Sequence, residues 1–199
     1  PPRSTLFPYT TLFRSLPRRG VRVSALNEED VRHAYEVMAA MEGLAGRAAA
    51  QHLDDGAIAG LHRLLLPSAG LLAAGDAEGL MRINRSFHGH LYEACRNRWV
   101  HTFCGQLWNY VYRLRRRHPQ SQRRLAQSVA EHAAILEAVA ARDADRVELL
   151  IRQHCARSRD DLLEQVAKGA MVGGERASAP SSPASIVPPS AARPKGEHP

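Results

Sequence analysis

The stretch Asn84-Arg85-Ser86-Phe87-His88 places a side-chain amide and an imidazole four residues apart. In a helix, Asn84 and His88 would lie one above the other on the same face. Apolar residues recur around the stretch at three-to-four spacing, which predicts a helix over about residues 77–95. The fold prediction starts from this helix, because its polar pair needs partners from neighbouring helices.

Two later histidines have the spacing of such partners. His132 and His154 lie on either side of a predicted helix–helix turn at residues 141–145, and they are equidistant from its middle. In an antiparallel helical hairpin they would therefore face each other. If the helix of Asn84 and His88 packs alongside, one amide oxygen and three imidazoles converge. That set suits a borderline divalent metal such as zinc, nickel or manganese. A single histidine on an apolar face is more often an ordinary core residue, but three in register favour a site.

These residues also carry a family resemblance. Phe87-His88, the run Glu131-His132-x-x-Ile135-Leu136 and the late His154 resemble the effector domain of GntR-type bacterial transcription regulators, in the subclass whose C-terminal domain is called FCD. The resemblance covers about residues 16–165. It implies a cytoplasmic homodimer that binds a small organic acid beside a divalent metal. The family places Asp, or sometimes Asn, at the position of Asn84. The amide here removes one negative charge and predicts weaker metal binding.

From residue 27 onward the pattern predicts an all-α protein, an antiparallel bundle of about six helices over residues 27–168. Asn27 and Asp54 are expected to cap the first two helices, and Pro67 is expected to break or kink the second. The family commonly has an arginine where Met38 stands in the first helix, so any role of that arginine in binding an anion is lost or moved here.

The two ends are predicted to lie outside this bundle. Residues 1–15 resemble a translated sequencing adapter, the alternative being a disordered leader. Residues 16–26 resemble the last strand and linker of a winged helix-turn-helix domain, which predicts a truncated regulator. Residues 169–199 hold six prolines and few large apolar groups, which predicts a disordered tail.

Charge argues against nucleic acid as the partner of the predicted bundle. The net charge is +7, but residues 27–168 carry 19 basic and 18 acidic residues. Base readout also needs a recognition element in a groove, and none is visible in this sequence. We therefore expect no specific DNA contact from this chain and only weak, salt-sensitive contacts from Arg18, Arg19 and Arg22. DNA would be reached through a separate N-terminal domain.

The cysteines and the hydropathy pattern point to a reducing compartment. The three cysteines have no C-x-x-C spacing, and we see neither a signal peptide nor an apolar run long enough to predict a membrane span. These features favour the cytoplasm.

A hairpin argument like the one for His132 and His154 predicts an effector site. With a turn near Asn97, residues on the helix of about 99–117 would lie level with Asn84 and His88. The expected lining residues are Gln106, Asn109, Tyr110 and Arg113. Arg113 would fork onto a carboxylate, although a surface arginine whose stem covers apolar neighbours is the competing interpretation.

Three function classes follow from the sequence. The first is the effector-sensing domain implied by the resemblance. The second is a metal-dependent helical enzyme, although Glu131 adjoins His132 and consecutive helix residues point about 100° apart, so it is poorly placed as a base. The third is a metal-free interaction bundle.

A two-fold dimer is also expected, because two of the predicted helices carry more apolar side chains than one bundle face needs. These side chains are Tyr35, Met38, Trp99, Trp108 and Tyr112.

Overall fold

The computed structural model describes residues 13–16, 20–23 and 28–176. Two short antiparallel strands come first, and the rest of the described chain is helical. In chain order the elements are β1 Phe13–Leu16, β2 Gly20–Val23, α1 Glu28–His52, α2 Asp55–Leu65, α3 Ser68–Ala73, α4 Ala77–Ala94, α5 Arg98–Arg117, α6 Gln122–Ala140 and α7 Ala144–Arg176. The prediction of an all-α bundle of about six helices is confirmed; a seventh helix arises because the predicted second helix is divided at Pro67.

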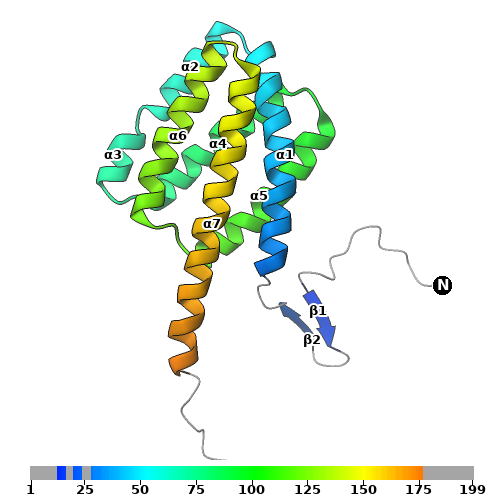
Figure 1. Ribbon diagram of the computed structural model, residues 1–199, viewed down its shortest axis with the longest axis vertical. Helices are drawn as coiled ribbons and strands as arrows, with labels where there is room; N and C mark the ends of the chain where they lie inside the picture. Colours follow the sequence, from blue (N-terminus) through cyan, green and yellow to red (C-terminus); the bar gives the residue numbers. More distant parts are fainter. Residues whose placement is uncertain (1–12, 17–19, 24–27, 177–199) are drawn as a thin grey trace, which may run out of the picture.

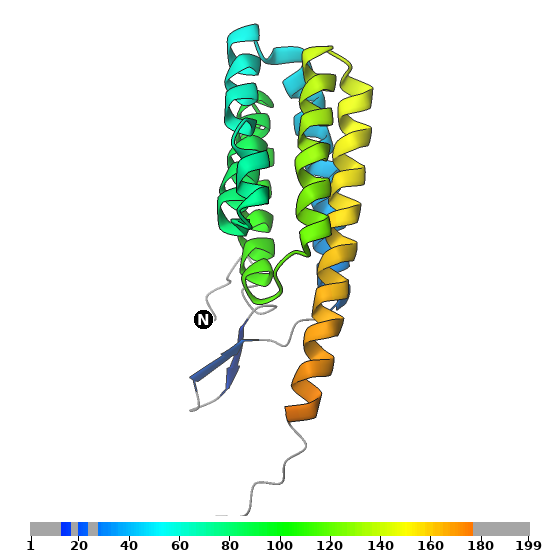
Figure 2. The same cartoon turned by 90° about the vertical axis from the view of Figure 1, so that its left-hand side faces the viewer.

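The helices run nearly parallel to one long axis and form two layers (Figures 1 and 2). One layer holds α1, α6 and α7, and the other holds α2 to α5. The most extensive packing joins α1 to α7, while α6 packs on α7 and α4 packs on α1. This arrangement brings α1, α4, α6 and α7 to a common interior, which is where the histidines lie.

Local sequence accounts for most helix ends. Asp54 caps α2 by accepting from the Ala57 amide, and Asp76 caps α4 in the same way through Gly79. Asn97 caps α5, and Ser121 caps α6. The expected cap at Asn27 lies outside the described residues.

The turns after α4 and after α6 both contain a residue in the left-handed backbone conformation. Arg96, after α4, and Arg142, after α6, both have positive φ angles, of 53° and 59°. In the α6–α7 turn, the Arg142 and Asp143 amides donate back to the Val139 and Ala138 carbonyls. This is the hydrogen-bond pattern of a Schellman turn, which satisfies the last carbonyls of α6.

The core spans the bundle, and its most extensive helix–helix contact is between α1 and α7. Val31, Ala45, Val147 and Ile151 are fully buried there. Gly46 permits this close approach, because a Cβ at that position would come within 2.2 Å of the Ile151 side chain. At this contact a glycine on α1 faces two branched residues on α7, Val147 and Ile151, and the two helices can therefore pack closely.

The structure adds two findings about the outer segments. α7 continues to Arg176, eight residues beyond the expected end at residue 168, and its last turns project past the other helices (Figure 1). Arg22 lies in β2, whereas Arg18 and Arg19 lie outside the described residues. The predictions for residues 1–12, 24–27 and 177–199 also concern residues outside the described ranges.

One stretch, residues 55–73, has the length and mean hydropathy of a membrane span. It does not form one continuous helix, because α2 ends at Leu65 and α3 begins at Ser68. Both helices pack on α4 and α6, so the stretch is one side of the bundle.

The surplus of apolar side chains that predicted a dimer is mostly absorbed by the bundle itself. Tyr35, Met38 and Trp108 are buried, and half-buried Tyr112 stacks on Trp108 at a ring-centroid distance of 5.2 Å. Of the five residues, Trp99 is the exposed one, at 56%. The reason given for the dimer therefore fails, and the dimer stays a prediction.

Candidate metal centre

Three buried histidines converge from three helices. His88 on α4, His132 on α6 and His154 on α7 are 2%, 4% and 5% exposed. Their ring centroids are 4.8 to 5.3 Å apart, and each offers a ligand atom within 4.8 Å of the other two. A tetrahedral zinc ion with bonds of about 2.0–2.1 Å needs nitrogens roughly 3.3 Å apart, so small ring rotations would close the site. The predicted meeting of these histidines agrees with the structure.

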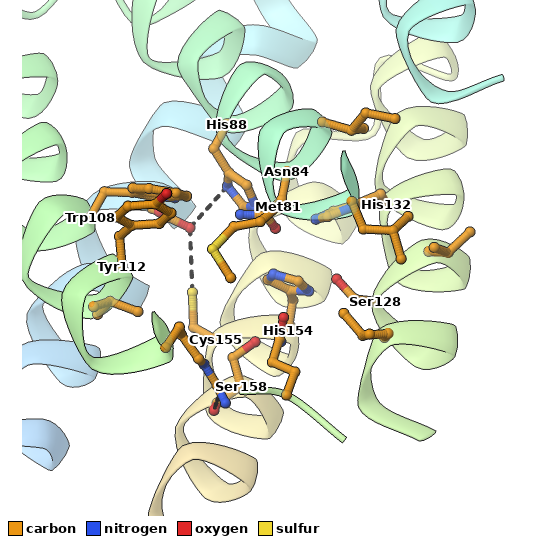
Figure 3. Close-up of a pocket in the computed structure, with 18 of the residues that line it drawn as sticks. Met81, Asn84, His88, Trp108, Tyr112, Ser128, His132, His154, Cys155 and Ser158 are labelled. Atoms are coloured by element: carbon orange, nitrogen blue, oxygen red, sulfur yellow. Dashed lines mark hydrogen bonds and ion pairs between the residues drawn. The ribbon is translucent and has the colours of Figure 1, made fainter. Parts of the chain in front are cut away.

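Asn84 lies beside them. It is half-buried one turn before His88, and it lines the same cavity as the three histidines. Figure 3 shows the rings of His88, His132 and His154 pointing toward one another, with Asn84 next to His88. All four predicted metal ligands therefore border one cavity of about 60 Å³.

The buried nitrogens indicate which atoms are available for a metal. Nε2 of His132 has no hydrogen-bond partner among the residues that the structure describes. Nδ1 of His154 lies 2.7 Å from the Glu131 carboxylate, which leaves Nε2 of His154 as its free lone pair. An unpaired buried nitrogen costs about 1–3 kcal/mol, and a bound ion would remove that cost. The residues present therefore fit a divalent metal.

Glu131 reaches His154 although it adjoins His132 on α6. It also accepts hydrogen bonds from Arg124 and Arg157. The sequence argument was correct that Glu131 and His132 point in different directions, but it missed that Glu131 would contact the histidine of the next helix. Glu131 thus orients a proposed ligand and is not placed as a base.

A second carboxylate, Glu42 on α1, lies on the far side of His88. It is 1% exposed, and one of its oxygens lies 3.1 Å from Nδ1 of His88, without the alignment of a hydrogen bond. Tyr92 donates to the carboxylate, and Cys155 donates to it at 3.4 Å. These contacts join α1 to α4 and α7 next to the histidine cluster.

The pKa values of His132, His154 and the two nearby carboxyls are all lowered. Burial holds the pKa of His132 well below its ordinary value, and the neighbouring rings add to this. Burial also lowers the pKa of His154, although Glu131 opposes it. Burial tends to raise the pKa of Glu131, but His154 and Arg124 bring it down to about 2. The lowered pKa values of His132 and His154 favour the neutral rings that metal binding requires.

The predicted effector residues do not line the cavity. Gln106, Asn109 and Arg113 are exposed, Tyr110 is half-buried, and none of the four is among the lining residues. Trp108, Val111, Tyr112 and Arg115 line it from α5 instead. The hairpin argument gave the right height along α5 but the wrong face, because a shift of two residues turns a helix by about 200°.

Arg115 is the cavity arginine, in place of Arg113. It is 4% exposed, and it donates to Asp161 at 2.7 Å and to the Ser158 carbonyl. Ser121 donates to the same Asp161 carboxylate at 2.8 Å. Arg115 therefore closes one end of the cavity while its own charge is matched within the bundle.

The sequence held a signal for the residues that were missed. Glu42 falls in the stripe Val31, Tyr35, Met38, Glu42, Ala45 and Ala49, and Arg115 falls in the stripe Cys104, Trp108, Val111 and Arg115. A charged residue at an inward position of an amphipathic helix is buried with a partner. Tracing each apolar stripe would have found both.

Comparison with known proteins assigns the family. A family model described as the FCD domain matches residues 33–157, more than half of the chain. The chain belongs to the FCD domain family. The match confirms the resemblance to the FCD domain that the histidine motifs carried.

A relative among curated proteins has a regulatory description. The chain is 35% identical over 71 residues to the uncharacterized HTH-type transcriptional regulator BphR of Paraburkholderia xenovorans. The match covers 36% of this chain and 29% of that protein, so it spans less than a third of the relative's length.

Three solved structures share the fold. E. coli McbR/YncC superposes with a TM-score of 0.66 at 18% identity, covering 77% of this chain and 78% of that one. The metal-free FCD domain of TM0439 gives 0.61 at 16% identity, covering 73% and 99%. A GntR regulator from Rhodococcus sp. RHA1 gives 0.61 at 18% identity, covering 77% and 73%. At these identities the likeness establishes the fold alone.

Proposed function

We propose that this FCD domain is the sensory domain of a transcription regulator and that it binds one divalent metal ion. His88, His132 and His154 would each supply a ring nitrogen, and Oδ1 of Asn84 would be the fourth ligand. The observation that carries the proposal is the convergence of three buried imidazoles, one with an unpaired Nε2, on a single cavity. Zinc, nickel and manganese are the candidate ions.

The effector we propose is a small organic acid. Three neutral imidazoles and an amide leave the charge of the ion uncompensated, so a carboxylate is favoured in its open coordination position. The cavity of about 60 Å³ has room for roughly four waters. An acid of about the size of acetate would therefore fit this conformation, and a larger one would require the bundle to open.

Effector binding would act on DNA through another domain of the regulator. The two sites would be coupled if the acid favours one arrangement of a dimer over another. A two-fold homodimer in the cytoplasm is the assembly we propose, since it is the commonest closed arrangement. The description of BphR as an HTH-type regulator supports the DNA partner.

The alternatives have less support. A hydrolytic enzyme needs a free base near the metal, but Glu131 is engaged by Arg124, Arg157 and His154. A metal-free interaction domain would leave the unpaired nitrogen of His132 without a reason. The metal-free FCD domain of TM0439 does show that this fold can exist without an ion.

Calorimetry tests the metal site. Zinc, nickel and manganese chloride are titrated into metal-stripped wild-type protein, His132→Ala and the control His101→Ala, which changes an exposed histidine of α5. We expect one site in the wild type and the control, and none in His132→Ala. Equal weak heats for all three proteins would refute it. Acetate and larger carboxylic acids are then titrated into the metal-loaded protein, and tighter binding of the larger acids would contradict the size limit.

A further inference from the structure

The Glu42 carboxylate is buried with an unusual set of partners. In the described part of the chain its ion-pair contact is His88, at 3.1 Å, and its other neighbours are the hydroxyl of Tyr92 and the thiol of Cys155. Taking a carboxylate out of water costs several kcal/mol unless it is well paired. One imidazole is a weak counter-charge, so the fold has no evident structural reason to keep an acid at this inward position of α1.

The other carboxylate at the site is matched by arginines. Glu131 contacts His154, but Arg124 and Arg157 both pair with it. Glu131 therefore brings no net negative charge to the cluster. Glu42 has no such partner among its recorded contacts, and its charge remains to be balanced.

We propose that Glu42 is a positioning residue of the metal site, which orients His88 and supplies the negative charge that Asn84 does not. The inference rests on the metal site proposed above. If the proton of His88 is on Nδ1, 3.1 Å from Glu42, then Nε2 is left for the ion, and a small rotation of the ring aligns the hydrogen bond that the metal-free structure lacks. This is the carboxylate–histidine–metal arrangement in which an outer carboxylate fixes the tautomer and raises the basicity of the ligand. The neutral amide of Asn84 does not offset the charge of the ion. The buried Glu42 carboxylate, which contacts the ligand His88, offsets part of it.

The role makes α1 part of the metal site, although α1 provides none of the proposed ligands. Glu42 on α1 contacts His88 and Tyr92 on α4 and Cys155 on α7. An ion on Nε2 of His88 strengthens the attraction between its Nδ1–H and Glu42. Metal binding would thus hold α1 and α4 together more firmly.

The first test compares zinc affinities by calorimetry in wild type, Glu42→Gln and the control Glu93→Gln, an exposed glutamate of α4. Glutamine keeps the length of the side chain and removes the charge. We expect Glu42→Gln to weaken zinc binding by about tenfold to a hundredfold, the usual effect of losing an outer-sphere partner, and Glu93→Gln to bind as the wild type does. Unchanged affinity in a folded Glu42→Gln protein would overturn the inference.

A double-mutant cycle separates charge from packing. Asn84→Asp adds a negative charge directly at the ion. If Glu42 compensates for Asn84, then Asn84→Asp should recover most of the affinity lost in Glu42→Gln, and the two effects should not add. Strictly additive effects would show that Glu42 acts only on the structure.

A measurement on the wild type does not depend on any variant folding. Nitrogen-15 NMR of the imidazoles in the zinc-loaded protein should show His88 bound through Nε2, with a hydrogen-bonded proton retained on Nδ1. Coordination through Nδ1 of His88 would overturn the inference while leaving the metal site in place. No zinc binding by the wild type would instead refute the proposed function itself, so the two failures are distinguishable.

Discussion

The α4–α5 and α6–α7 hairpins have similar turns, with Arg96 and Arg142 in the left-handed region. The residues that face the cavity could be predicted from the sequence for the second hairpin but not for the first. The same mirror argument was applied to both. It correctly brought His132 opposite His154, but it selected Gln106, Asn109, Tyr110 and Arg113 on α5, which lie off the cavity.

Packing explains the difference. α6 and α7 pack on each other along their length, whereas α4 and α5 contact each other much less, and both pack on α1. Equal distance from a turn predicts a meeting only where the two helices are direct neighbours. It also fixes height and leaves the rotation of each helix open. His132 and His154 lie within their apolar stripes, while Arg113 lies off the stripe that contains Arg115.

The largest effect we expect is on stability, and it should distinguish Arg115 from Arg113, two arginines that are two residues apart on α5. Arg115→Ala leaves Asp161 buried without its guanidinium partner and should lower the free energy of unfolding by about 3–5 kcal/mol. Arg113→Ala removes an exposed side chain and should change it by less than about 0.5 kcal/mol. Urea denaturation followed by circular dichroism measures both. Similar losses in the two variants would mean that the face of α5 is misassigned.

The second prediction compares the zinc affinity of a variant in each hairpin. His154→Ala should weaken zinc binding by more than about a hundredfold, since losing a ligand exceeds the usual outer-sphere effect. Gln106→Ala, at the position that the mirror argument chose on α5, should leave zinc affinity within about twofold of wild type. Competition with a chromophoric chelator gives both constants. A loss of zinc binding in Gln106→Ala would mean that α5 contributes to the metal site, although Gln106 was predicted to line the effector site and not to bind the metal.

The third prediction concerns acid stability of the metal-free protein. Burial depresses the pKa of His132 and His154 in the folded state, so the unfolded chain takes up protons first as pH falls. Stability contributed by these neutral rings is present above the unfolded pKa near 6.5 and is lost below it, by about 1.4 kcal/mol per pH unit for each proton taken up on unfolding.

The carboxylate of Glu131, with a pKa of about 2 in place of 4.5, adds a second loss as pH falls from about 4.5 toward 2. Urea titrations from pH 7 down to about pH 2 should show both phases. His132→Phe should flatten the upper phase, whereas the control His101→Gln on α5 should not. Stability that rises as the pH drops below 6.5 would contradict the buried neutral state.

The smallest effect compares the two turns themselves. Arg96→Gly should stabilise the protein by about 0.5 kcal/mol, because glycine adopts a positive φ without the cost that other residues carry. Arg142→Gly should give no such gain, because the Arg142 guanidinium donates to the Ala50 and Leu53 carbonyls and to Asp55. Thermal unfolding of both variants in one buffer would show the difference. A gain in both would mean that the Arg142 contacts contribute nothing.

The sequence by itself determined the helical bundle, most helix ends and the histidine set. Periodicity at three-to-four spacing, caps at Asp54 and Asp76, and the break at Pro67 are local signals that need no knowledge of neighbours. The meeting of His132 and His154 could be predicted because one short turn joins their helices.

The tertiary structure alone decided what surrounds those histidines. Glu42 contacts His88 from 46 positions away in the chain, and Arg115 pairs with Asp161, contacts that depend on how α1, α5 and α7 rotate about their axes. That rotation depends on the packing of the whole core, for example on the close contact of Gly46 with Ile151. It cannot be predicted from the sequence of any one helix. The proposed ligands could be predicted from local sequence patterns, whereas the charged residues around them depend on how distant helices pack.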